Sequence, residues 1–66
     1  MDAAAKLQPE LDTEELGLLV ELLNRELRDL PAEIHHTRTA AFREQLRRRM
    51  AAAERLMARL RPLLRE

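Results

Sequence analysis

Apolar residues recur every three or four positions along two stretches of the chain, and a short polar stretch separates them. The first stretch carries Leu16, Leu19, Val20, Leu23, Leu27, Leu30 and Ile34. At about 100° per residue these positions form a stripe roughly 100° wide, as in an amphipathic helix packed on a core. The second stretch carries Phe42, Leu46, Met50, Ala53, Leu56, Met57, Leu60 and Leu64. No stretch alternates apolar and polar residues as a half-buried strand would, so the pattern predicts an all-α fold.

The first helix has a clear start signal, and we expect it over residues 12–36. Asp12 can cap the first backbone amides, and Glu15, three residues later, can reach back to complete a capping box. Leu11 and Leu16 have the spacing of a hydrophobic staple around this cap. Gly17 lies off the stripe, and a close approach of another helix is one explanation for it.

Pro31 lies inside this pattern and should kink or end the helix, because it removes the amide that would bond to the carbonyl of Leu27. Ile34 nevertheless falls on the same stripe as Leu16 and Leu27. Because the phase is kept across the proline, the pattern favours a kinked helix that continues to about residue 35 over a stop at Leu30.

The second helix is expected over residues 39–61, after a turn at residues 37–39. Either Thr37 or Thr39 can cap its start. Pro62 predicts its end and leaves residues 62–66 as a tail. Residues 1–11, which include Pro9, are predicted to be a flexible lead-in.

Pairing of the two stripes predicts an antiparallel hairpin. Facing residues in such a hairpin have position numbers with a nearly constant sum. The pairs with one shared sum are Leu16 with Leu60, Leu19 with Met57, Val20 with Leu56, Leu23 with Ala53, Leu30 with Leu46, and Ile34 with Phe42. The midpoint is Arg38, between the two threonines. The same sum places Leu27 opposite Arg49, whose stem can lie on apolar surface while its head group stays in water.

Composition narrows the class of protein. The 66 residues are 45% hydrophobic and 36% charged, which is typical of a small folded helical domain. Without cysteine, neither a disulfide nor a thiolate metal site can stabilise so short a chain. No apolar run is long enough to span a bilayer, and no signal-peptide pattern begins the sequence, so we expect a cytoplasmic protein.

The charges are divided between the two halves of the chain. Residues 1–36 hold nine acids and three bases, a balance of −6, and residues 37–66 hold nine bases and three acids, a balance of +6. Opposite halves of this kind indicate that the two helices face each other.

Two further leucines indicate a partner. Leu18 and Leu22 project about 100° from the centre of the first stripe, one turn apart. A lone two-helix hairpin buries each stripe on one side only, and small chains without disulfides or metals usually associate. We therefore expect a homodimer or a helical protein partner, with two hairpins forming a four-helix bundle through these leucines.

Two polar clusters are candidate binding sites, one for a metal ion and one for nucleic acid. Glu33 and His36 have the Glu-x-x-His spacing of metal-binding bundles, on a strip that also carries Glu26 and Asp29, but a solvated acidic face explains them as well. The arginines Arg43, Arg47, Arg48, Arg55 and Arg59 could bind nucleic acid. No aromatic residue is interleaved with them to stack bases, so pairing with acids of the first helix or of a neighbouring subunit is the simpler explanation.

No catalytic residues are predicted. The chain has no Cys, Ser or Tyr, and its single glycine cannot form a phosphate-binding loop. The sequence thus favours a non-enzymatic interaction or assembly module without a cofactor. A nucleic-acid-binding hairpin is the first alternative, and a metal-binding bundle through Glu33 and His36 is the second.

The run from Asp12-Thr13-Glu14-Glu15-Leu16 to Glu33-Ile34-His35-His36-Thr37 resembles small bacterial helical-hairpin proteins over about residues 11–60. The resemblance implies the hairpin fold, and it brings no catalytic residues with it.

Overall fold

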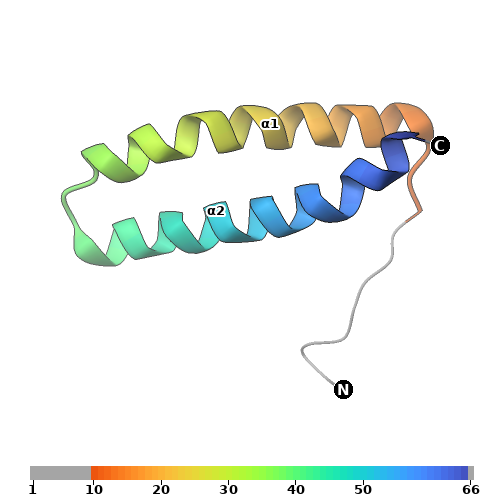
Figure 1. The fold of residues 1–66 in the computed structure, drawn as a ribbon. Helices are drawn as coiled ribbons and strands as arrows, with labels where there is room; N and C mark the ends of the chain where they lie inside the picture. Colours follow the sequence, from red (N-terminus) through yellow and green to blue (C-terminus); the bar gives the residue numbers. More distant parts are fainter. Residues whose placement is uncertain (1–9, 66) are drawn as a thin grey trace, which may run out of the picture.

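The computed structural model of the chain describes residues 10–65, which form two antiparallel α-helices joined by a short turn (Figure 1). α1 spans Thr13–His36, α2 spans Ala40–Leu60, and a short 3₁₀ helix, η1, spans Arg61–Arg65. Residues 10–65 contain no strand, so the predicted all-α fold with two helices is confirmed. Most of the expected lead-in, residues 1–9, lies outside the described residues.

The start of α1 is fixed by the capping box that the sequence predicts. The backbone N–H of Glu15 donates to Asp12 Oδ1 at 2.7 Å, and the N–H of Asp12 donates to Glu15 Oε1 at 3.0 Å. Two amides that have no partner within the helix are thereby satisfied. The acidic side chains of Glu14 and Glu15 in the first turn also suit the positive end of the helix dipole.

α1 continues through Pro31 to His36. The proline removes one backbone hydrogen bond, yet the residues on either side of it, Leu30 and Ile34, lie against α2. Leu30 is only 1% exposed and is the most completely buried large side chain in the described chain. Burial of the stripe across the proline offsets the lost bond, because each fully buried leucine contributes about 2 kcal/mol.

The two threonines of the turn, residues 37–39, have different roles. Thr37 ends α1: its N–H donates to Ile34 O at 3.3 Å and its hydroxyl donates to Glu33 O at 2.5 Å. Thr39 is the residue that caps α2, with extended backbone, but its side chain makes no capping hydrogen bond. The carbonyl of Thr37 also accepts a 2.6 Å hydrogen bond from Arg43 Nη2, which ties the start of α2 to the turn.

The end of α2 comes just before Pro62, at Leu60. Residues 62–65 of the expected tail are instead part of a 3₁₀ helix, η1, which follows α2 directly; residue 66 lies outside the described residues. η1 also contacts α1, whose start lies beside it in Figure 1.

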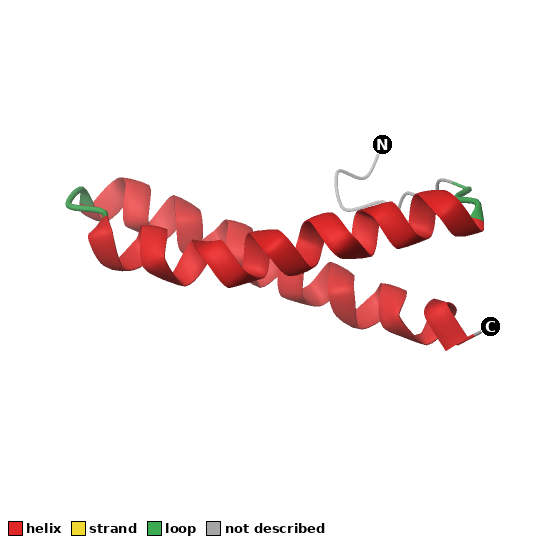
Figure 2. Cartoon of the chain, turned by 90° about the horizontal axis from the view of Figure 1, so that it is seen from above, coloured by secondary structure: helices red, strands yellow, loops and turns green. Residues whose placement is uncertain are grey.

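The core is a single layer between the two helices, which cross at a shallow angle in Figure 2. Its fully buried members are Leu16, Leu30, Leu46, Ala53, Met57 and Leu60. Most other predicted stripe residues are half-buried; they are Leu19, Val20, Leu23, Leu27, Ile34, Met50 and Leu56. A two-helix layer leaves each stripe open at both edges, which is why so many of these side chains remain partly exposed.

Phe42 corrects the prediction. It was expected in the core opposite Ile34, but its side chain is 51% exposed. Ile34 lies instead with Arg43 and Met50, on the other side of the hairpin from Phe42. Arg43, the next residue, donates a hydrogen bond to the carbonyl of Thr37, and Phe42 lies about 100° away from it around the helix, at the edge of the core. Leu64, predicted to extend the second stripe, is also exposed, in η1.

Candidate protein interface

An apolar depression of about 340 Å³ runs between α1 and α2 on one side of the hairpin. Its apolar lining consists of Leu19, Leu22 and Leu23 from α1 and Ala52, Ala53 and Leu56 from α2. Leu22 is 47% exposed, and Leu18, one helical turn earlier, is 55% exposed. Of the two leucines predicted for association, the structure thus places Leu22 in the lining of an open apolar groove, whereas Leu18 is exposed outside that lining.

The groove is crossed by an ion pair between the helices. Arg49 Nε donates to Glu26 Oε2, and both residues line the depression. The sequence placed Arg49 opposite Leu27, with its head group in water; the acid one position earlier holds that head group instead. Among residues 10–65 this is the only ion pair that joins α1 to α2. Positions 26 and 49 add up to one less than the sum shared by the predicted core pairs. Allowing a difference of one in that sum would have identified this ion pair from the sequence.

A second depression, of about 610 Å³, continues the first toward the turn. It shares Glu26 and Arg49 with the groove and is completed by Glu33, Phe42, Gln45 and Leu46. The exposed Phe42 therefore lies on the same side of the hairpin as Leu22. We call this side the groove face and define it by Leu19, Leu22, Phe42, Ala52 and Leu56 around the Glu26–Arg49 pair.

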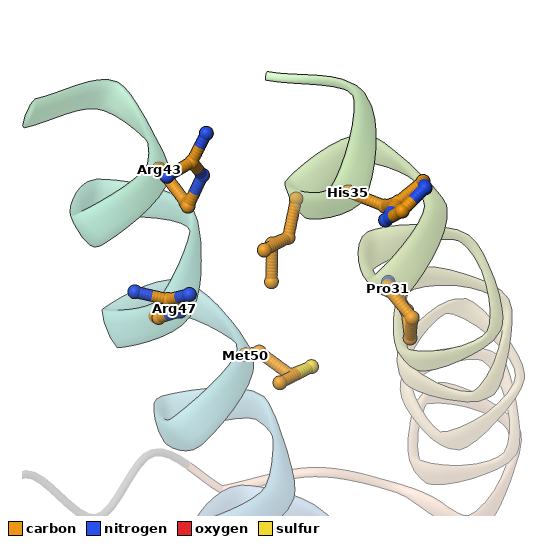
Figure 3. A pocket seen from close by; sticks show the side chains of 6 residues that line it. Pro31, His35, Arg43, Arg47 and Met50 are labelled. Carbon is orange, nitrogen blue, oxygen red and sulfur yellow. The ribbon is translucent and has the colours of Figure 1, made fainter. Parts of the chain in front are cut away.

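The other side of the hairpin carries a different pocket, of about 710 Å³. Figure 3 shows Pro31 and His35 of α1 across from Arg43, Arg47 and Met50 of α2, and Ile34 completes the lining. We call this side the basic face.

The two arginines of the basic face differ in their surroundings. Arg43 is partly buried and bonded to the turn. The guanidinium of Arg47 lies 4.0 Å from the Glu44 carboxylate, in an exposed pair worth at most about 1 kcal/mol.

The arginines predicted for nucleic-acid binding do not form one surface. Arg43 and Arg47 belong to the basic face, whereas the exposed residues Arg48, Arg55 and Arg59 lie on the outer side of α2. At about 100° per residue the two groups are separated by roughly 80° to 160° around the helix. A nucleic-acid backbone would thus meet one group or the other.

The predicted metal-ligand pair, Glu33 and His36, has no third ligand grouped with it in the described chain. Within residues 10–65, no group of three or more His, Asp or Glu side chains could hold a metal ion. Glu33 lines the groove face, while the ring of His36 lies edge-on to that of His35, with centroids 5.2 Å apart. One hairpin therefore offers these two residues without further ligands beside them.

Neither helix of the described chain has an apolar stretch long enough to cross a membrane.

Comparisons with models of protein families, with curated proteins and with solved structures found no match to this chain. The resemblance to small bacterial helical-hairpin proteins therefore stays an expectation, and the function has to be argued from the surface itself.

Proposed function

We propose that this protein is a non-enzymatic helical association module that packs its groove face against the groove face of a second copy, forming a four-helix bundle. The observation that supports this most directly is that exposed Leu22 and exposed Phe42 line two adjoining depressions on one side of the hairpin. Large apolar side chains left exposed along a groove typically mark an interaction site.

The incomplete core supports the same proposal. Half of the apolar stripe residues remain partly exposed at the edges of a single layer between two helices. A second hairpin laid over the groove face would cover Leu19 and Leu56 together with Leu22. This is how four-helix bundles complete their cores.

The distribution of charge favours a second copy as the occupant. Within α1 there are six acids and two bases, a balance of −4; within α2 there are six bases and two acids, a balance of +4. A surface built from one helix of each sign is complementary to itself when a copy is turned over it, because each acidic helix can then meet a basic one. The acidic and basic flanks would set the register, while the leucines supply the apolar area.

The experiment is a measurement of native mass by light scattering on the wild type, Leu22→Lys and Asn24→Lys. Leu22 belongs to the groove face, whereas Asn24, on the same helix, is about 160° away around the axis. We expect a dimeric wild type, a dimeric Asn24→Lys protein and a monomeric Leu22→Lys protein with helical circular dichroism retained.

Two outcomes would contradict the proposal. A dimer mass unchanged in Leu22→Lys would show that another surface is used. A monomeric wild type that binds oligonucleotides, with affinity falling steeply as salt is added, would favour the arginines of α2 as the functional groups.

A further inference from the structure

Two hairpins can meet face to face through a two-fold axis in two ways. If the axis runs along the helices, each α1 lies across the partner's α2 and both turns are at the same end. If the axis runs across the helices, each α1 lies across the partner's α1 and the turns are at opposite ends. We infer that the dimer has its turns at the same end, an inference that rests on the proposed self-association.

The Glu26–Arg49 pair carries this inference. The midpoints of α1 and α2 fall near residues 24–25 and 50, so the pair lies near the middle of the groove face. In any dimer with full overlap, the pairs of the two copies therefore come together. With the turns at the same end, Glu26 lies opposite the partner's Arg49, and the four groups alternate in sign.

The other arrangement would bring like charges together at the same place. The two Glu26 side chains would then lie within about one helical turn of each other, and so would the two Arg49 side chains, because each pair is close to the middle of its helix. Covering such groups removes water from them, and like charges in a desolvated interface are strongly unfavourable. The net charges of the helices favour the same arrangement. With the turns at opposite ends, α1, whose net charge is −4, would lie on the partner's α1; with the turns at the same end, it lies on the partner's α2, whose net charge is +4.

A second pair at the rim points to the same arrangement. Asp29 and Arg48 are exposed, and at about 100° per residue they lie about 60° from Glu26 around α1 and about 100° from Arg49 around α2, toward the outer sides of the helices. The core register pairs residues whose numbers sum to about 76, and Asp29 with Arg48 gives 77. With the turns at the same end, Asp29 thus lies opposite the partner's Arg48. With the turns at opposite ends, two copies of α1 would run antiparallel, so residue 13 of one would lie opposite residue 36 of the other. Asp29 would then lie opposite the partner's α1 near position 20.

A spin label at the turn tests the orientation directly. The chain has no cysteine, so Arg38→Cys gives one attachment point per copy, at an exposed residue of the turn. With neighbouring helices about 10 Å apart, turns at the same end should give a label separation of roughly 10–25 Å by electron double resonance. Turns at opposite ends would give more than roughly 30 Å, since 21 residues of α2 at 1.5 Å each span that length.

A charge swap at the rim gives an independent test. Asp29→Arg and Arg48→Asp should each raise the Kd of the dimer about fivefold, and the double variant should return it to within about twofold of wild type. Glu21→Arg, which reverses an exposed acid of α1 away from the groove face, should leave the Kd unchanged.

The outcomes separate the two proposals. A dimeric mass with labels more than roughly 30 Å apart, or a double variant as weak as either single one, would overturn the orientation and leave self-association standing. A monomeric mass without dipolar coupling between labels would overturn self-association itself.

Discussion

The groove face and the basic face are two sides of the same pair of helices, and they differ in what they leave exposed. The groove face combines leucines, Phe42 and an ion pair whose charges cancel, Glu26 with Arg49. The pocket of the basic face has two arginines and a histidine in its lining and no acid. Burial of the first would keep the charges of Glu26 and Arg49 paired with each other, whereas burial of the second would leave cations without partners.

In the proposed dimer, this difference directs association to one face of the hairpin. Two helices cannot close a core, so both edges of the apolar layer are open. Charge on one edge keeps that side in water, and apolar side chains on the other leave one face to be covered. The comparison therefore predicts that substitutions on the two faces have unequal effects on association.

The largest effect should come from the layer that both faces share. Leu30→Ala removes the most deeply buried side chain, and such a change typically costs 2–5 kcal/mol in folding free energy. In so small a domain we expect loss of the folded helices and of both faces together, measured by circular dichroism during urea unfolding. Leu18→Ala, at an exposed position, is the matched control and should leave the helices folded. Equal behaviour of the two variants would contradict the assigned core.

Reversing one charge of the Glu26–Arg49 pair, so that both residues carry the same sign, should strongly weaken the dimer. Glu26→Arg and Arg49→Glu should each weaken the dimer by about a hundredfold, because four like charges would meet at its centre. A mixture of the two variants should associate again, as a heterodimer, when followed by light scattering or native mass spectrometry. Failure of the mixture to associate would place the pair outside the interface.

A comparison of single exposed side chains on the two faces should give a smaller difference. Phe42→Ser removes an exposed ring from the groove face and should raise the Kd of the dimer about tenfold, the loss expected for a partly buried aromatic residue. Arg47→Ser on the basic face should leave the Kd within about twofold of wild type. Sedimentation equilibrium at several concentrations measures both. A larger effect at Arg47 than at Phe42 would reverse the assignment of the faces.

The smallest change expected is a gain in stability away from the groove face. Gly17 is exposed, and a Cβ built there has no atom within 4 Å, so the close helix approach considered from the sequence does not occur within the hairpin. Gly17→Ala should therefore raise the free energy of unfolding by about 1 kcal/mol through helix propensity. Thermal unfolding would measure this gain, and the Kd of the dimer should stay the same. A dimer weakened by the added methyl group would instead show that a partner helix packs against Gly17.

Much of the fold follows from local patterns in the sequence. The capping box at Asp12 and Glu15 is a local arrangement of neighbouring residues, so its spacing alone predicts it. The passage of α1 through Pro31 follows from the phase that Leu30 and Ile34 keep across it. The exposed pair of leucines at positions 18 and 22 also follows from helical periodicity.

The candidate interface was only half predictable. Periodicity places Leu18 and Leu22 on one edge of α1, but nothing in α2 showed which of its residues share that edge. Phe42 fits the apolar stripe as well as Leu46 does, and only the contacts at the turn distinguish them.

The two helices, the turn between them, the apolar stripe on each and the division of charge all follow from the order of residues along the chain. The rotation of α2 against α1 is seen only in the folded hairpin. That rotation places Arg43 at the turn, turns Phe42 onto the groove face and brings Arg49 to Glu26. The physical reason is that a period of 3.6 residues fixes positions around one helix axis, whereas the rotation between two helices depends on contacts between residues distant in the chain.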